Sequence, residues 1–269
     1  MQLALDHIVH FLHRSPAEPV EQFRQHGYHA VAGGRHVTWG TWNSLSYFGL
    51  SYVEFLSVEL PEIAANSDNP LIRQLVGEQN RGEGLGQIAL RTREMDQWAE
   101  HFAGKGLQVT GPVAGSRKRD DGTVIRWRML FLRDPDSGLV PPFLIEWEAD
   151  DAERKHDLTQ RGVIAAHPNG AAAVDSIVYA TTDLDEAASR WQHWFDWQSG
   201  DVYLDDLLGA RCRKFSLSGG DVVLCEPVRA GIAQEALDSR GERPFAVRIA
   251  GAAKEGLDQV YGGYYVRMR

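Results

Sequence analysis

The sequence predicts an α+β fold in which tandem βαβββ units pair into curved mixed sheets around a central cleft. Two observations predict it: the order strand, helix and three strands recurs along the 269 residues, and its spacing recurs too. His7 and Glu54 are 47 residues apart, and the same interval separates Ser176 from Val223. One such unit leaves an apolar sheet face that it cannot bury alone, so we expect the units to pair.

The first unit begins with a short apolar strand over residues 5–11. A helix follows over 16–27, because apolar side chains recur there at helical spacing and a glycine ends the pattern. Aromatic and β-branched residues then predict strands within 36–48 and over 51–58.

The second and third units repeat this order. The second has a strand at 86–92, a helix at 94–105, and strands starting at 109, 124 and 142. In it the interval from Gln87 to Glu146 grows to 59 residues, because a polar loop at 115–122 adds length. The third unit has a strand at 174–180, a helix at 184–195 and a last strand at 221–226.

A fourth, shorter copy at 245–269 has strands but no clear helix. We therefore predict a first domain of two full βαβββ units at 1–155, a linker at 156–173 that contains a Pro-Asn-Gly turn, and a degenerate second domain at 174–269.

Composition limits the classes of function. The net charge is −9, which argues against nucleic acid as a partner, and no run approaches the roughly 18 apolar residues of a membrane span. The N-terminus lacks a basic leader and the chain has two cysteines, so we expect a cytoplasmic protein. A hairpin with Gly219-Gly220 as its loop would put Cys225 opposite Lys214 and only diagonal to Cys212. The expected partner is a small-molecule ligand, and a homodimer is a further prediction.

Several motifs carry a family resemblance. Asp134-Pro135-Asp136-Ser137-Gly138, before the last strand of the second unit, is similar to a turn of the vicinal oxygen chelate superfamily, which includes glyoxalase I and the extradiol dioxygenases. Gly33-Gly34-Arg35-His36, Gly40-Thr41-Trp42-Asn43 and Tyr52-Val53-Glu54-Phe55-Leu56 resemble the bacterial glyoxalase-like domain family. The resemblance covers roughly residues 3–165 and implies the vicinal oxygen chelate fold, which hosts many activities.

The resemblance implies a divalent metal site. Superfamily members bind metal through the first and last strands of each paired unit, and these positions map onto His7, Glu54, Gln87 and Glu146. One imidazole, one amide and two carboxylates suit Zn, Ni, Co, Mn or Fe without selecting among them.

An alternative without metal also fits the residue types. His7 can remain a neutral hydrogen-bonding histidine, and the two glutamates can pair with Arg91 or Arg128 instead. In either case we expect His36, Trp39, Thr41 and Asn43 to line the cleft, with His36 as an acid or base near neutral pH. Supporting the glycine turns of this segment is the competing role for Thr41 and Asn43.

Two functions follow from the resemblance. The first is a metal-dependent lyase or isomerase that stabilises an enediolate, with Glu146 as the base and Glu54 as its symmetric partner. The second is a non-catalytic small-molecule binding or drug-sequestering protein, for which the net charge of −9 favours cationic ligands. A dioxygenase ranks low, because it usually needs two histidines and one carboxylate.

Overall fold

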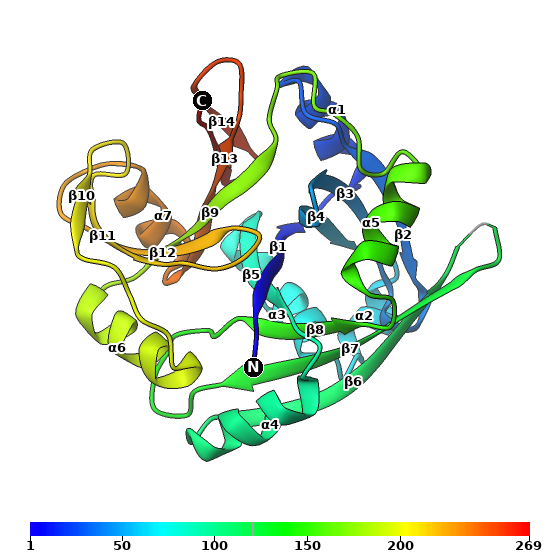
Figure 1. Cartoon of the computed structure of the whole chain (residues 1–269), viewed down its shortest axis with the longest axis horizontal. Helices are drawn as coiled ribbons and strands as arrows, with labels where there is room; N and C mark the ends of the chain where they lie inside the picture. The colour runs from blue at the N-terminus through cyan, green and yellow to red at the C-terminus, as the bar shows by residue number, and fades with distance from the viewer. Residues whose placement is uncertain (120) are drawn as a thin grey trace.

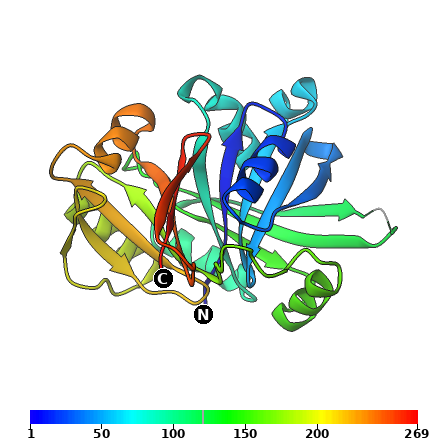
Figure 2. The ribbon, with the colours of Figure 1, turned by 90° about the horizontal axis from the view of Figure 1, so that it is seen from above.

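The computed structural model describes residues 1–119 and 121–269. It has two curved mixed sheets that lie side by side, one from each half of the chain (Figure 1, Figure 2). The first sheet has the strand order β2-β3-β4-β1-β5-β8-β7-β6 and the second β10-β11-β12-β9-β13-β15-β14. The predicted fold is confirmed, including the missing helix in the fourth unit, where β13, β14 and β15 follow one another.

The first sheet consists of β1 (Ala4–Leu12), β2 (Val31–His36), β3 (Thr41–Phe48), β4 (Ser51–Val58), β5 (Gly84–Arg91), β6 (Gln108–Lys118), β7 (Val124–Arg133) and β8 (Phe143–Trp147). The second consists of β9 (Ala173–Ala180), β10 (Tyr203–Asp205), β11 (Ala210–Phe215), β12 (Asp221–Pro227), β13 (Arg243–Ala250), β14 (Gly256–Val260) and β15 (Gly263–Arg267). The helices are α1 (Ala17–Gln25), α2 (Pro61–Ala65), α3 (Pro70–Gly77), α4 (Met95–Gly104), α5 (Asp151–Gln160), α6 (Leu184–Phe195) and α7 (Ile232–Arg240).

Strand β1 organises the first half. It pairs in parallel with β4, where His7 lies opposite Tyr52, and antiparallel with β5, where Ile8 lies opposite Ile88. Side chains alternate across a strand, so Ile8 enters the large apolar cluster shared by both halves while Val9 enters a smaller cluster on the opposite face. The second face is the one that carries the cavity described below.

The segment after β8 is helical. A capping box at Asp150 and Glu153 starts α5, so the predicted linker at 156–173 begins inside a helix. The division into domains at 1–155 and 174–269 stays a prediction. None of the helices in the described ranges is long and apolar enough to cross a membrane.

The predicted placement of the cysteines is wrong. Cys212 and Cys225 lie directly opposite each other on β11 and β12, because the pairing ends at Phe215 and Val222 and the loop is longer than two residues. Both are buried free thiols, and the neighbouring Cys212 together with burial raises the pKa of Cys225.

Candidate functional site

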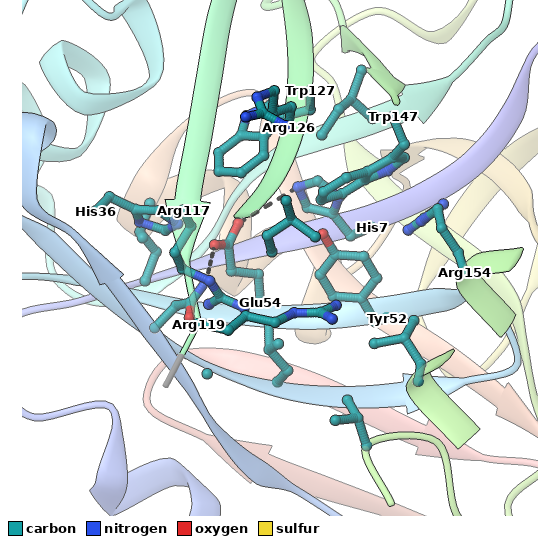
Figure 3. Close-up of a pocket in the computed structure, with 18 of the residues that line it drawn as sticks. His7, His36, Tyr52, Glu54, Arg117, Arg119, Arg126, Trp127, Trp147 and Arg154 are labelled. Carbon is teal, nitrogen blue, oxygen red and sulfur yellow. Dashed lines mark hydrogen bonds and ion pairs between the residues drawn. The ribbon is translucent and has the colours of Figure 1, made fainter. Parts of the chain in front are cut away.

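A cavity of about 260 Å³ opens on the concave face of the first sheet. Its floor comes from β1, β4 and β8, and its walls come from α3, α5 and the β6–β7 hairpin. Figure 3 shows His7, Tyr52 and Glu54 at its centre, with aromatic and arginine side chains around them. The site therefore lies where the sequence predicted the cleft of the first pair of units.

His7 and Glu54 meet in this cavity from neighbouring strands. His7 Nε2 lies 3.5 Å from Glu54 Oε2, as the dashed line in Figure 3 marks. The imidazole stacks on Tyr52 at 4.5 Å and meets the edge of Phe143 at 5.7 Å between ring centres. The ring is thus held between two aromatic side chains with one nitrogen facing a carboxylate.

Asp6 holds the other nitrogen of this histidine. Nδ1 of His7 donates to Asp6 Oδ1 at 2.7 Å, which leaves Nε2 to face Glu54. Asp6 is fully buried and also accepts from Trp147 Nε1 at 3.1 Å and Arg154 Nη1 at 3.3 Å. Burial alone would raise the pKa of Asp6. The charge of Arg154 and the hydrogen bond from His7 outweigh that effect and lower the pKa to about 2.

Asn43 fixes the carboxylate of Glu54. Its Nδ2 donates to Glu54 Oε1 at 2.6 Å, and its Oδ1 accepts from the backbone N–H of Gly34 at 2.8 Å. A Cβ at Gly33 would lie 2.0 Å from Asn43 Oδ1, so only glycine lets the chain pass this close. The Gly-Gly pair and Asn43 therefore act together, and both roles weighed for Asn43 apply.

His36, Trp39 and Thr41 lie as a group at one end of the cavity. His36 Nδ1 is 3.1 Å from Thr41 Oγ1, and its ring lies 5.7 Å from that of Trp39. His36 and Trp39 line the cavity, whereas Thr41 is buried behind His36. Burial lowers the pKa of His36 despite the opposing charge of Glu54, which favours the neutral imidazole at neutral pH.

Arginine side chains dominate the charge of the cavity, so the net charge of the chain did not predict it. Five arginines line the cavity, namely Arg117, Arg119, Arg126, Arg154 and Arg161. Four of them pair with carboxylates, as Arg119 does with Asp157 at 2.7 Å. Arg117 is half-buried and has no ion pair or hydrogen bond within residues 1–119 and 121–269. Burial lowers its pKa, with Tyr47 and Glu54 opposing that effect.

Glu146 lies on the opposite face of β8 from the cavity. Arg128 Nε donates to its Oε2 at 2.8 Å, and the backbone N–H of Met95 in α4 donates to its Oε1 at 3.4 Å. Its neighbours Ile145 and Trp147 line the cavity, because strand side chains alternate. The structure therefore gives Glu146 the ion pair with Arg128 that we considered as an alternative, away from His7 and Glu54.

The strand register gives the reason. Ala89 pairs with Phe143 between β5 and β8, so Phe143 is the counterpart of Glu54, and the sequence alignment of the units was three residues too far along. Gln87, which we aligned with His7, lies opposite Val9 on β1, and its Oε1 accepts from the N–H of Ile88 at 2.9 Å.

These residues do not fit a metal centre of the superfamily type. Two of the four expected ligands converge, the third is engaged with the backbone, and an apolar ring takes the fourth position. In the described part of the chain no cluster of three or more His, Cys, Asp or Glu side chains is arranged to hold a metal ion. A structural zinc or catalytic site needs at least three protein ligands.

Sequence reasoning missed several functional side chains. Arg117 belongs to the segment 115–122 that we interpreted as a polar loop, yet it lines the cavity. Asp6 directly precedes His7 in an apolar strand, and a carboxylate there signals a buried partner. That partner, Arg154 of α5, is 148 residues away, and no local pattern points to it.

Comparison with known proteins identifies the family. The model of the family described as "Glyoxalase-like domain" matches residues 5–195. A hypothetical protein from Staphylococcus aureus has a similar structure, with 20% identity, a TM-score of 0.77 and 98% of each chain covered. A mutant of 4-hydroxymandelate synthase from Streptomyces coelicolor has 11% identity and a TM-score of 0.58, over 93% of this chain and 71% of that one.

No curated protein matches the chain. Identities this low support the fold alone, whereas the family model covers well over half of the sequence. The chain belongs to the glyoxalase-like domain family and has the fold of the vicinal oxygen chelate superfamily.

Proposed function

We propose that this protein binds a small organic anion with a flat apolar body in the cavity of its first half. The observation that carries the proposal is Arg117, a half-buried guanidinium that lines the cavity without a carboxylate partner in the described ranges. A cation withdrawn from water is costly unless an anion compensates it. A bound carboxylate or phosphate would supply that compensation, and guanidinium geometry suits both.

The walls of the cavity suggest the body of the ligand. Trp39 and Trp127 lie 6.0 Å apart between ring centres, and Trp127 is 5.5 Å from Trp147. Leu45 and Met129 add apolar surface. Such walls favour an aromatic or similarly flat group, and the cavity volume of about 260 Å³ limits the ligand to a small molecule.

Calorimetric titration tests this proposal with benzoate and phenyl phosphate, and with benzamide and benzylamine as uncharged and cationic analogues. We expect only the anions to bind, equally well with and without EDTA. Arg117→Gln should weaken their binding about tenfold or more, as loss of a charge-assisted hydrogen bond predicts.

The matched control is Arg126→Gln. Arg126 also lines the cavity, but it is exposed and pairs with Glu148 at 3.4 Å, so we expect an effect below about threefold. Equal binding of benzamide and benzoate, or equal effects of the two substitutions, would contradict the proposal.

A second candidate function is an isomerase or lyase without the expected metal. The contacts among Asp6, His7 and Glu54 favour it, because Glu54 stands beside a cation-lined cavity and His7 is oriented toward it. With the ligand anion on Arg117, Glu54 would remove a proton from the adjacent carbon and His7 would share it.

Deuterium exchange distinguishes the two functions. If the protein is an isomerase or lyase, 2-hydroxy and 2-oxo acids incubated in D₂O lose their C–H signals in NMR spectra with wild type but not with Glu54→Gln. Retained binding by Glu54→Gln in the calorimeter serves as the control. No exchange by the wild type, or exchange that survives Glu54→Gln, leaves the binding function.

We also propose that the protein is cytoplasmic and forms a homodimer. The free thiols of Cys212 and Cys225 support a reducing compartment. Light scattering on the purified protein tests the homodimer, which a monomer mass near 30.0 kDa would contradict.

A further inference from the structure

A second cavity, of about 330 Å³, lies at the junction of the two halves. Three arginines line it: Arg81, at the end of the short helical turn after α3, and Arg240 and Arg243, at the end of α7 and the start of β13. Figure 2 shows α7, in orange, and the cyan segment around α3 along the same edge of the molecule. The cavity is separate from the one that contains His7 and Glu54.

These arginines share too few carboxylates. Arg240 Nη2 lies 3.4 Å from Glu78 Oε2, and Arg243 contacts the same oxygen. The other oxygen of Glu78 accepts from Gln74 Nε2 at 2.9 Å. Arg81 Nη1 donates to the backbone carbonyl of Arg240 at 3.4 Å. Glu78 is therefore the carboxylate partner of both Arg240 and Arg243, and Arg81 contacts a backbone carbonyl instead.

The acidic residues that line this cavity are engaged elsewhere. Glu83 accepts from Arg14 Nε at 2.8 Å and from the backbone N–H of His13 at 2.8 Å. Glu235 is exposed and accepts from the hydroxyl of Tyr264 at 3.3 Å. In the described part of the chain neither is paired with the three arginines: Arg14 neutralises Glu83, whereas Glu235 keeps its charge at an exposed position. Three guanidiniums against Glu78 and Glu235 still leave an excess of positive charge.

Burial makes this excess costly. Arg240 and Arg243 are each only 8% exposed, and the Nε atom of each is buried without a hydrogen-bond partner among the described residues. Burial first, and then the charges of Arg243 and Arg81, lower the pKa of Arg240 to about 10. Burial and neighbouring like charges both disfavour the charged form of a basic side chain.

We propose that this junction is a second anion site, for a small molecule that carries a phosphate-type dianion. Glu78 leaves two guanidinium charges over and the exposed Glu235 is not in contact with them, so a dianion suits the buried part of the cluster. Pro244, Phe245 and Tyr264 form an apolar wall beside the arginines, which fits an organic group attached to the anion. Because the site joins the helical turn after α3 in one half to α7 and β13 in the other, its occupation would also stabilise their contact.

Titration of inorganic phosphate, phenyl phosphate and benzoate into the Arg117→Gln variant tests the proposal. That background removes the anion partner proposed for the first cavity, so failure of one site is distinguishable from failure of the other. We expect saturable binding of inorganic phosphate, tighter binding of phenyl phosphate, and weaker binding of benzoate, which carries a single charge.

Two substitutions with opposite effects separate a ligand site from a purely structural cluster. Arg81 is exposed, so Arg81→Gln leaves the core intact and should weaken phosphate binding about tenfold. Glu78→Gln removes the competing carboxylate and should strengthen it by a similar factor. Arg229→Gln, an exposed arginine that pairs with Asp206 on the surface, should have no effect.

Absence of phosphate binding at millimolar concentration would overturn the proposal. So would an affinity that neither Arg81→Gln nor Glu78→Gln changes, because the arginines would then serve only to join the two halves.

Discussion

The two halves of the molecule use the same strand register but different cleft chemistry. In the first sheet His7 lies opposite Tyr52, and in the second Ser176 lies opposite Asp221. Glu54 therefore corresponds to Val223, as the equal spacing in the sequence predicted. The scaffold accepts either two ionisable residues, His7 and Glu54, or a serine and a valine at these positions.

The second cleft is filled from within its own chain. Ala233 and Ala236 of α7 pack in one apolar cluster with Val223, Cys212 and Cys225. Small side chains let the helix approach the sheet closely. The comparison shows one scaffold used in two ways: polar and charged side chains line a cavity in the first half, and α7 packs against the corresponding face in the second.

The charge network of the first cleft includes Asp6, and the second half has an aspartate at the equivalent strand position. Asp6 precedes His7, and Asp175 precedes Ser176 at the matching position. Asp6 is fully buried and bound by Arg154, whereas Asp175 is half-buried and accepts from Ser176 Oγ at 2.9 Å. The same carboxylate at the same strand position thus has two different energetic roles.

The largest expected effect follows from this difference. Asp6→Asn removes the charge that compensates the buried Arg154 and should lower the free energy of unfolding by about 3–5 kcal/mol. Asp175→Asn is the matched control and should cost less than about 1 kcal/mol. Urea unfolding of both variants at pH 7 measures the difference, and equal losses would contradict the distinct roles of the two aspartates.

Acid titration checks the same residue independently. The folded pKa of Asp6, about 2, lies below its ordinary value of 3.8, so its contribution to stability is complete above pH 4. That contribution, about 2 kcal/mol, is lost as the pH falls from 4 to 2. The wild type should lose it in this window and Asp6→Asn should not.

The sequence predicted the repeat and the fold, for reasons that are local. Strand and helix patterns and equal spacing depend on neighbouring residues, and the structure places His7, Glu54, His36 and Asn43 from these patterns in one cavity. The predicted position of Glu146 in the cavity was wrong, because the longer loop of the second unit at 115–122 obscured the register of β8. A shift by an odd number of residues places a side chain on the opposite face of the strand.

The charge of the cavity could not be predicted from sequence. Arg117 and Arg154 come from a hairpin and a helix that only tertiary folding places over β1 and β4. Their sequence neighbourhoods are rich in charged residues, which is the usual pattern of a solvated surface. Whether an arginine in such a run faces water or a cavity depends on the curvature of the sheet beneath it.

A second prediction concerns His10, which faces the opposite side of β1 and joins the halves. Its Nδ1 lies 2.7 Å from the hydroxyl of Tyr265, and its Nε2 lies 3.0 Å from the carbonyl of Tyr261. Burial lowers the pKa of His10 from 6.5 to about 4. The unfolded chain therefore binds a proton before the folded one does, and stability falls as the pH drops from about 6.5 to 4.

The expected contribution of His10 is about 3 kcal/mol over that interval. The difference in unfolding free energy between wild type and His10→Gln should shrink by this amount between pH 7 and pH 4. His156→Gln, at an exposed position of α5, is the control and should follow the wild type at every pH. A constant difference for His10→Gln would mean that folding does not lower the pKa of His10.

The third and smallest effect tests why the first cleft differs from a metal centre. Phe143 is the strand counterpart of Glu54, and its ring edge meets His7. Phe143→Glu should therefore place a second carboxylate near His7 and Glu54, which gives three ligands for a divalent cation. We expect Zn²⁺ or Ni²⁺ to stabilise this variant by about 1–3 kcal/mol at 10–100 times its dissociation constant.

Thermal unfolding with and without metal, together with metal analysis after dialysis, measures this gain. Phe143→Gln has a side chain of the same shape as Phe143→Glu but no charge, so it separates ligand formation from the loss of the aromatic ring. The wild type and Phe143→Gln should show no metal-dependent stabilisation. If the wild type gains as much as Phe143→Glu, then His7 and Glu54 bind metal without a third carboxylate, and the ring of Phe143 is not what separates this cleft from a metal centre.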